Sequence, residues 1–272
     1  MFAINRNVLL LPIWSIEVGL STQYKSLKDK VVFITGGASG IGASMVKAFV
    51  QQEAKVAFID LNQDMAENLI NNLSSTLHHN VWFRAIDVTK SESLQQAITD
   101  AAAHFGRLDV LVNNVGNDNR QDIEKISAHD WHKCMQVNLD PAFFSAQTAY
   151  TIMKKNISGS IINFSSINAL IGLQNMTGYV TAKAGLMGMT KALSKEFGDH
   201  NIRVNAIVPG WVATERQLTS WLTNKEEDKW TEAMALKKRI LPEDIANLAL
   251  FLASNDSALI TGQSIIIDGG RT

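Results

Sequence analysis

A glycine-rich turn between an apolar strand and a helix most constrains the fold of this 272-residue chain. Val31–Thr35 is a short β-branched apolar run, and Thr35-Gly36-Gly37-Ala38-Ser39-Gly40-Ile41-Gly42 follows it, opening a helix predicted over Ile41–Gln52. Glycine permits a tight turn and a close approach of a phosphate to the backbone. The free N–H groups of a helix N-terminus favour an anion. The turn therefore predicts a strand–turn–helix unit that binds the pyrophosphate of a dinucleotide.

Short apolar strands alternate with helical segments along the rest of the chain. The strands lack polar alternation, which is typical of a parallel sheet covered on both faces. We therefore predict an α/β fold, a single-domain doubly wound parallel sheet of seven strands with helices on both faces. The other predicted strands are Lys55–Ile59, Val81–Ile86, Val110–Val112, Ile161–Phe164, Val204–Val208 and Ser264–Ile267, and the other helices are Met65–Leu77, Ser91–Phe105, Ile123–Met135, Asp140–Asn156, Tyr179–Phe197 and Pro242–Ala253.

The N-terminal residues 1–26 stand outside this pattern. Their apolar run Val8–Trp14 follows Arg6, as in a signal peptide. However, Pro12 interrupts the run, and no clear signal-peptide cleavage site follows it. The run is also too short to span a bilayer. We expect residues 1–26 to be an extension that lies on the domain or at a subunit contact, or else to result from an upstream start codon and add little function. We expect the domain itself to cover residues 27–272.

One long stretch, Gly210 to about Leu241, carries no strand or helix pattern in the sequence. It contains Trp211, Trp221 and Trp230 with charges between them. An irregular segment of that size inside a compact domain is usually functional. We predict that residues 210–241 form a lid over a substrate, helical once folded.

The composition of the chain excludes some classes of binding partner. The formal net charge is -1 and no dense Lys/Arg run occurs, which argues against nucleic acid or an anionic membrane as the main partner. The single cysteine, Cys134, excludes an internal disulfide framework and fits a reducing compartment, so we expect a cytoplasmic protein. The histidines form no cluster with metal-ligand spacing, and we predict no metal site.

An acidic residue, Asp60, ends the second predicted strand. A carboxylate at this position accepts hydrogen bonds from the adenosine ribose hydroxyls and repels a 2′-phosphate. Neither the glycine turn nor the residues just after Asp60 carry an Arg or Lys that would attract that phosphate. The pattern predicts NAD rather than NADP.

Residues that end the third and fourth strands extend this site. Asp87-Val88 is placed to contact adenine, and Asp87 could also cap the helix that begins at Ser91. Asn113-Asn114-Val115-Gly116 lies at the carboxyl edge of the sheet, where ligands bind in such folds.

Tyr179 and Lys183 are four positions apart in a predicted helix and share one face. A cationic Lys183 would favour the phenolate and lower a tyrosine pKa that starts near ~10. Tyr179 could then act as a general base near neutral pH. The alternative is an ordinary pair on a helix surface.

The motifs Thr-Gly-x-x-x-Gly-x-Gly, Asn-Asn-x-Gly, Ser, Tyr-x-x-x-Lys and Pro-Gly occur in the order found in the short-chain dehydrogenase/reductase family. The chain resembles this family over about residues 27–272, with Val115 where the family usually has alanine. The resemblance implies a Rossmann-type fold and a catalytic tetrad. Tyr179 resembles the general base, Lys183 its helper, Ser166 the serine that orients the reacting hydroxyl, and Asn138 the asparagine that holds a water for proton relay.

The same resemblance implies the rest of the cofactor site and an assembly. The Pro209–Thr214 segment resembles the one that binds the nicotinamide amide, and Lys183 would also bind the nicotinamide ribose. Helices Asp140–Asn156 and Tyr179–Phe197 would form a dimer face within a homotetramer. The expected cofactor-binding residues are Gly36, Ser39, Gly40, Ile41, Gly42, Asp60, Asp87, Val88, Asn114, Gly116, Tyr179, Lys183, Pro209, Gly210, Val212 and Thr214.

The substrate is indicated by a polar loop, Asn117-Asp118-Asn119-Arg120, because leaving such groups unpaired against an apolar substrate would cost ~1–3 kcal/mol each. This loop, together with Arg216-Gln217, is similar to bacterial aldose 1-dehydrogenases of the D-xylose dehydrogenase group, which oxidise an anomeric carbon to a lactone with NAD. That group carries Trp-His where this chain has Asn168-Ala169, so the wall of the pocket differs. The expected substrate contacts are Asn117, Asp118, Arg120, Asn168, Gln174 and Trp211.

Two other functions remain open from the sequence. A 3-oxoacyl or hydroxysteroid dehydrogenase of the same family would need an apolar lid pocket, for which Trp211, Trp221 and Leu222 are candidates. A non-catalytic NAD-binding sensor would have no need of Tyr179 and Lys183 together.

Overall fold

Seven parallel strands form one sheet in the computed structural model, which describes residues 22–220 and 224–272. Their order across the sheet is β3-β2-β1-β4-β5-β6-β7, so strands are added in one direction from β1 to β3 and in the other from β4 to β7, with the switch point between β1 and β4. This confirms the predicted doubly wound fold. The strands are β1 (Val31–Thr35), β2 (Lys55–Asp60), β3 (Val81–Ala85), β4 (Val110–Asn113), β5 (Gly159–Phe164), β6 (Ile202–Pro209) and β7 (Ser264–Ile267).

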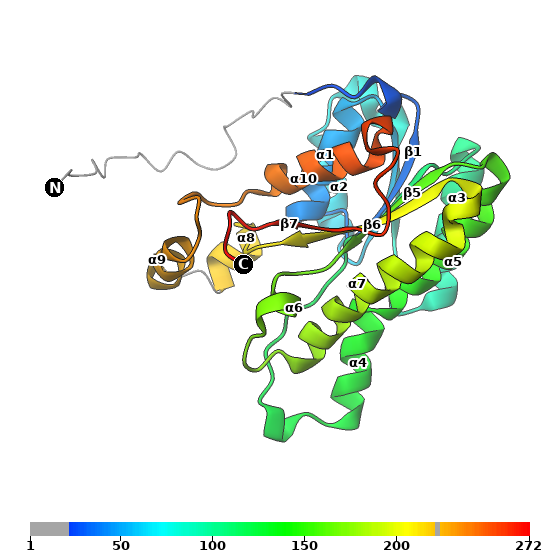
Figure 1. Ribbon diagram of the computed structural model, residues 1–272. Coiled ribbons are helices and arrows are strands. Elements are labelled where there is room, and N and C mark those ends of the chain that lie inside the picture. The colour runs from blue at the N-terminus through cyan, green and yellow to red at the C-terminus, as the bar shows by residue number, and fades with distance from the viewer. Residues whose placement is uncertain (1–21, 221–223) are drawn as a thin grey trace, which may run out of the picture.

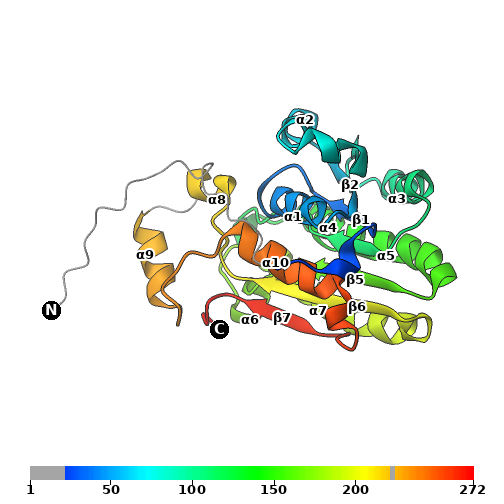
Figure 2. The same cartoon turned by 90° about the horizontal axis from the view of Figure 1, so that it is seen from above.

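Helices cover both faces of the sheet (Figure 1), and the view from above separates the layers (Figure 2). One apolar core lies under α1, α2 and α10, and a second lies under α3, α5 and α7. The helices are α1 (Gly40–Gln51), α2 (Gln63–Asn71), α3 (Ser91–Phe105), α4 (Ala128–Asn138), α5 (Asp140–Met153), α6 (Asn168–Ile171), α7 (Thr177–Phe197), α8 (Glu215–Ser220), α9 (Asn224–Glu232) and α10 (Pro242–Ala253).

Burial on two faces explains why the strands read as unbroken apolar runs. Val32 and Ile34 of β1 belong to the first core, whereas Val31 and Phe33 belong to the second. Successive strand residues point to opposite faces. Since both faces are packed against helices, every position of β1 is buried and an alternating pattern would have left polar groups in the core.

Some predicted helix boundaries are wrong. The helix expected over Ile123–Met135 is a 3-10 turn followed by α4, because Ser127 forms a capping box with Asp130 and starts the α-helix there. The helix expected over Met65–Leu77 stops at Asn71. The stretch 210–241, which shows no helix pattern in the sequence, contains α8 and α9, in agreement with the prediction that it is helical once folded.

The described part of the N-terminal extension lies on the domain. The Gln52 side chain, which is buried, accepts from the Tyr24 N–H (2.6 Å) and donates to the Thr22 carbonyl (3.1 Å). Residues 1–21, and Trp221 and Leu222 of the segment after α8, lie outside the described residues. Among the helices that the structure describes, none combines the length and apolar character needed to cross a membrane.

A buried polar network joins the carboxyl ends of β4 and β5 to two helices. The strand register places Asn113 beside Asn163, and the Asn113 amide donates to Asn163 Oδ1 at 2.9 Å. Ser145 of α5 donates to Asn113 Oδ1 (2.6 Å), and Asn163 donates to Thr190 Oγ1 of α7 (2.9 Å). Buried polar groups are costly unless they are paired. The network therefore fixes α7 against the strand ends.

We expect Thr190→Val to lower the free energy of unfolding by about 1–3 kcal/mol, because the Asn163 amide loses its acceptor in a buried site. Urea unfolding followed by circular dichroism measures the change. Thr99→Val is the control: its hydroxyl donates to the Gln95 carbonyl on the exposed surface of α3, so its effect should stay within about 0.5 kcal/mol. Equal losses in both variants would contradict the role of the network.

Candidate functional site

The glycine turn leaves the backbone open beneath the N-terminus of α1. Gly36 and Gly40 have φ of +67° and +51°, which favour glycine, and a Cβ on Gly42 would lie 1.8 Å from the Gly36 carbonyl oxygen. Ser39 precedes α1 without capping it by its side chain. The turn thus combines a cradle that a side chain would fill with free N–H groups, and it fits the pyrophosphate predicted from the sequence.

Asp60 is held in place at the end of β2. One carboxylate oxygen accepts from the Ala38 N–H and the other from the Asn62 N–H, both at 3.0 Å. The next side chain, Leu61, is apolar and 72% exposed. The carboxylate therefore stands beside the glycine turn without a cation next to it in sequence.

Asp87 and Val88 lie at the end of β3. Asp87 accepts from both the backbone and the hydroxyl of Thr89, and these bonds lower the pKa of its carboxyl. The residue at the N-cap of α3 is Lys90, so the alternative that Asp87 caps this helix is wrong. The Val88 side chain is buried in the second core, which leaves its backbone for any contact with a ligand.

Asn114 ties β4 to the glycine turn. Its amide donates to the carbonyls of Thr35 (3.1 Å) and Gly36 (3.0 Å). Gly116 follows, and a Cβ there would lie 3.0 Å from Lys183 Nζ. Two predicted cofactor residues are thus brought into contact with the turn and with the predicted tetrad.

The Pro209–Thr214 segment also reaches the glycine turn. The Pro209 carbonyl accepts from the Ile167 N–H at 3.0 Å, and Val212 pairs with Ile240 in an isolated bridge. A Cβ on Gly40 would lie 3.1 Å from Thr214 Cγ2. The structure therefore gathers the predicted cofactor segments around one edge of the sheet.

The four residues of the predicted tetrad converge at this edge. Lys183 is 2% exposed, donates to the Phe164 carbonyl at 2.8 Å and lies 5.7 Å from the centre of the Tyr179 ring. Asn138 accepts from the Asn117 N–H (2.7 Å) and donates to the Asn117 carbonyl (3.1 Å). The surface-pair alternative for Tyr179 and Lys183 is wrong, because Lys183 is buried.

The two adjacent serines differ in their contacts. Ser165 donates to the Lys183 carbonyl at 2.8 Å and is thereby committed to α7. Ser166 accepts from the Asn168 N–H at 3.2 Å, which leaves its own O–H to donate elsewhere. The geometry agrees with the assignment of Ser166 rather than Ser165 from the spacing to Tyr179.

The expected low pKa of Tyr179 is wrong for the protein alone. Burial disfavours the phenolate and raises the pKa of Tyr179 to about 12; the Ser166 hydroxyl and Arg216 oppose the rise, and Asp118 adds to it. Burial also lowers the pKa of Lys183 to about 8. Desolvation therefore outweighs the pairing that the spacing suggested, and at neutral pH Tyr179 is a phenol.

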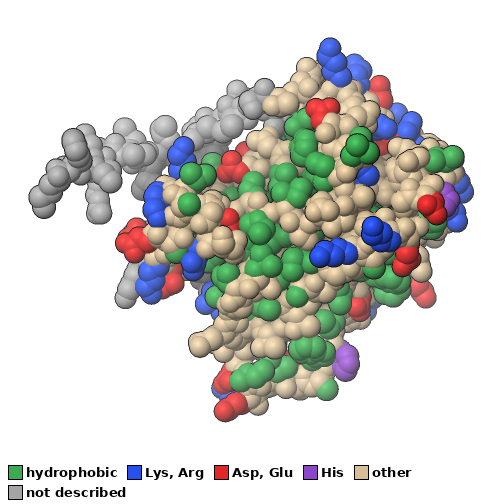
Figure 3. Space-filling view, viewed as in Figure 1, with side chains coloured by type: hydrophobic (Ala, Val, Ile, Leu, Met, Phe, Trp, Pro, Cys, Tyr) green, Lys and Arg blue, Asp and Glu red, His purple; other side chains and the backbone are tan. Residues whose placement is uncertain are grey.

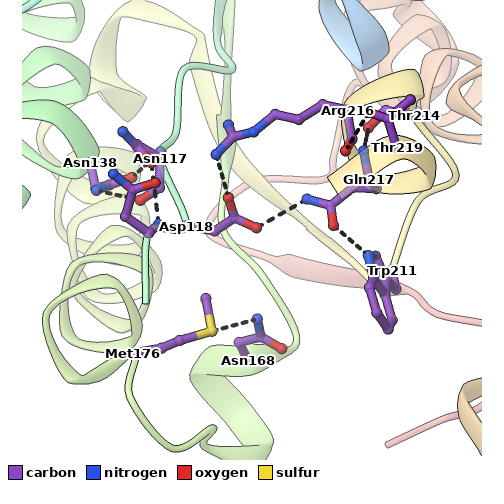
Figure 4. Close-up of polar contacts among 11 residues, drawn as sticks. Asn117, Asp118, Asn138, Asn168, Met176, Trp211, Thr214, Arg216, Gln217 and Thr219 are labelled. Atoms are coloured by element: carbon purple, nitrogen blue, oxygen red, sulfur yellow. Dashed lines mark hydrogen bonds and ion pairs between the residues drawn. The ribbon is translucent and has the colours of Figure 1, made fainter. Parts of the chain in front are cut away.

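The predicted substrate residues divide into two groups (Figure 4). Asp118 and Trp211 belong to one connected set of hydrogen bonds, and Asn117 is bound to Asn138. The Asn168 side chain approaches the sulfur of Met176 at 4.0 Å, while Gln174 and Arg120 are exposed on loops.

Two residues at this site, Arg216 and Gln217, were named in the family resemblance but were not among the expected substrate contacts. Arg216 and Gln217 both donate to the Asp118 carboxylate, at 2.9 and 3.0 Å. Their place just after the Pro209–Thr214 segment was the available signal. Nothing in the sequence pairs them with Asp118, which is about a hundred positions away. Within residues 22–220 and 224–272, no group of three or more His, Cys, Asp or Glu side chains could hold a metal ion.

Comparisons with known proteins identify the family that this chain is similar to. Residues 36–272 match the family model described as enoyl-(acyl carrier protein) reductase. The chain is 40% identical over 250 residues to a probable galactose dehydrogenase of Rhizobium meliloti, and 42% identical over 250 residues to the D-xylose 1-dehydrogenase of Caulobacter vibrioides. Each alignment covers 92% of this chain and 98% of the relative.

The fold has close counterparts among solved structures. A short-chain alcohol dehydrogenase candidate from Sinorhizobium meliloti 1021 superposes with a TM-score of 0.84. It is 31% identical in sequence, and the superposition covers 91% of this chain and 98% of that one.

The tyrosine pKa is open to direct measurement, because the chain has only three tyrosines. With ¹³C-labelled tyrosine, we expect the Tyr179 signal, assigned from Tyr179→Phe, to remain that of a phenol at pH 10, where an ordinary tyrosine is half ionised. Asp118→Asn should lower this pKa by removing a negative charge, and Arg216→Gln should raise it by removing a positive one.

Asp122→Asn serves as the control, since Asp122 pairs with Lys125 and does not contribute to the pKa of Tyr179. A Tyr179 that is half ionised at or below pH 10 would contradict the dominance of burial.

Proposed function

Since this chain belongs to the short-chain dehydrogenase/reductase family, we propose that it is an NAD-dependent sugar dehydrogenase that oxidises an anomeric hydroxyl and yields a lactone. The one observation that carries this proposal is the placement of the polar loop 117–120 against the tetrad. The backbone N–H and carbonyl of Asn117 are both hydrogen-bonded to the Asn138 side chain, and Asp118 is the next residue in the chain. Relatives named for galactose and xylose support a sugar.

Ser166 and Tyr179 would handle the substrate hydroxyl. The Ser166 oxygen already accepts a hydrogen bond, so its O–H can donate to the substrate oxygen and orient it. Tyr179 would take the hydroxyl proton as general base. When bound, the oxidised nicotinamide ring accepts the hydride and brings a positive charge, which opposes the effect of burial on Tyr179.

Lys183 would carry the proton onward. Two of its ammonium donors are directed to the Phe164 and Val115 carbonyls, and one remains for a ribose hydroxyl. Burial brings its pKa to about 8, close to the pH at which a proton relay works well. Asn138 would extend the relay through a water, as the family resemblance suggests.

The choice of NAD rests on Asp60. Its carboxylate is fixed by two backbone N–H groups beside the glycine turn, and Leu61 next to it offers no cation for a 2′-phosphate. An anionic group at this point favours ribose hydroxyls and disfavours a phosphate.

A second candidate is oxidation or reduction of an apolar acyl or steroid substrate. Leu170, Ile171 and Leu173 follow Ser166 closely and are 46%, 38% and 38% exposed. Such a surface suits an acyl chain, and the matching family model is described as an acyl-carrier-protein reductase. The polar loop beside the tetrad favours the sugar.

We also propose a cytoplasmic homotetramer. An apolar groove between α5 and α7 is lined by Leu139, Phe143, Phe144 and Met189. Ile266 on the edge strand β7 is 46% exposed, and hydrophobic side chains occupy the middle of the face that carries β7 and α10 (Figure 3). Two apolar surfaces of this kind suit two different two-fold contacts. On the face that Figure 3 shows, positive and negative side chains are interspersed around the hydrophobic area. Such a surface has no large field of one sign, which argues against nucleic acid as a partner.

Activity against a panel of pentoses, hexoses and hydroxysteroids tests the function. We expect NAD reduction with at least one sugar, and a fall of kcat by at least about 10²-fold in Tyr179→Phe with NAD binding nearly unchanged. Tyr150→Phe is the control. Tyr150 lies near the C-terminal end of α5, and its hydroxyl is hydrogen-bonded to His200 rather than to any residue of the proposed site. Turnover of a steroid with all sugars inert would exclude the sugar proposal.

Cofactor choice is tested by Asp60→Ala. The loss of charge-assisted hydrogen bonds worth ~1.5–3 kcal/mol should reduce the preference for NAD over NADP by about tenfold or more. The ratio of kcat/KM for the two cofactors measures it. Asp64→Ala, in the first turn of α2, should leave the ratio unchanged. If the two variants behave alike, Asp60 does not select the cofactor.

A further inference from the structure

A set of polar contacts joins the loop after β4 to helix α8 (Figure 4). Asp118 Oδ1 accepts from Arg216 Nη2 at 2.9 Å, and Asp118 Oδ2 accepts from Gln217 Nε2 at 3.0 Å. Trp211 Nε1 donates to Gln217 Oε1 at 2.7 Å. We propose that these four residues form a clasp that holds residues 211–220 of the segment 210–241 over the substrate, with Arg216 and Gln217 determining specificity for a polyhydroxylated one. The specificity part rests on the proposed sugar dehydrogenase function.

One end of the clasp is anchored to the tetrad. Asp118 follows Asn117, whose N–H and carbonyl are both bound by the Asn138 side chain. Val115 lies two residues before Asn117 in this loop, and its carbonyl accepts a hydrogen bond from Lys183 Nζ at 3.5 Å. On the other side, the Gln121 N–H donates to the Asn175 carbonyl at 2.7 Å. The position of Asp118 is therefore set by the same residues that we propose for the reaction.

The other end of the clasp is continuous with the proposed cofactor segment. The Thr214 carbonyl accepts a hydrogen bond from the Leu218 N–H at 2.9 Å, and the Thr214 hydroxyl accepts one from the Gln217 N–H at 3.4 Å. Thr214 therefore starts α8. The same Thr214 lies against Gly40 of the glycine turn. Any ordering of Thr214 on the cofactor side would thus be passed to Arg216 and Gln217.

The charged residues of the clasp also act on the pKa values of the proposed reacting groups. The Asp118 charge raises the pKa of both Tyr179 and Lys183, and the Arg216 charge lowers that of Tyr179. The other group that acts on both is Cys134 of α4. Asp118 and Arg216 therefore take part in the electrostatics of the proposed reacting pair as well as in the clasp.

The hydrogen bonds of the clasp to Asp118 can be replaced by hydrogen bonds from a substrate. The Arg216 and Asp118 side chains are 51% and 26% exposed, and ion pairs with such exposure contribute little to stability. Sugar hydroxyls both donate and accept, so a sugar can replace Arg216 or Gln217 on the carboxylate without leaving a polar group unpaired. An apolar substrate offers no such replacement, and if it displaced Arg216 and Gln217 it would leave the Asp118 carboxylate without hydrogen bonds.

Kinetics of Gln217→Leu and Arg216→Gln test the specificity. We expect KM for the sugar to rise about tenfold in each, the effect of one lost substrate hydrogen bond, with a much smaller change in kcat. Arg239→Gln is the matched control: Arg239 lies in the same segment and pairs with Glu227, not with Asp118. It should leave KM within about twofold of the wild type.

Hydrogen exchange tests the clasp without any substrate. Amides of residues 212–220 should exchange several-fold faster in Gln217→Leu and Arg216→Gln than in the wild type and in Arg239→Gln, because α8 loses its attachment. Arg216→Lys, which keeps the charge, should restore part of the protection. If exchange in the clasp variants equals that in Arg239→Gln, the clasp is overturned.

The two proposals fail in different ways. If the wild type oxidises sugars but the clasp variants and Arg239→Gln have the same KM, the specificity assignment is overturned and the sugar dehydrogenase stands. If the wild type oxidises no sugar, the proposed function and the specificity assignment both fail. Exchange of residues 212–220 then decides the clasp by itself: protection lost in the variants supports it, and unchanged protection overturns it.

Discussion

The burial of one ammonium group organises this molecule. Lys183 is 2% exposed, and a charge in such a place must be held by hydrogen bonds. Its partners are the Phe164 carbonyl at the end of β5 and the Val115 carbonyl just beyond β4. These contacts require the carboxyl ends of two strands and the first turns of α7 to meet at one point, and the Asn113–Asn163–Thr190 network keeps them there.

The same burial creates a conflict that the proposed chemistry has to resolve. Desolvation raises the pKa of Tyr179 to about 12, which is the reverse of what a general base needs, although it brings the pKa of Lys183 to about 8. The groups that can adjust this balance are Ser166, which hydrogen-bonds the tyrosine, and the Asp118–Arg216 pair of the clasp. The acid–base behaviour of the site is therefore linked to the segment that we propose as its lid.

Particular residues show how far sequence reasoning reached. The helices Ser91–Phe105 and Pro242–Ala253 and the strand Ser264–Ile267 were predicted with their observed bounds, because apolar periodicity and Pro242 mark them clearly. The start of α4 was missed, since Ser127 caps it and overrides the apolar pattern that began at Ile123. Asp87 turned back on Thr89 instead of capping α3, a local choice between two hydrogen bonds that spacing cannot decide.

The family resemblance supplied the tetrad and the nicotinamide segment, whereas the sequence by itself determined the fold class, the position of the glycine turn and the spacing of Tyr179 and Lys183. It could do so because strand periodicity, glycine conformational freedom and helix spacing are local properties of the chain. Only the tertiary structure decided that Lys183 is buried, that Tyr179 is a phenol in the protein alone, and that Asp118 pairs with Arg216 and Gln217. Desolvation and contacts between segments about a hundred residues apart depend on how the whole chain packs, and no local pattern in the sequence records them.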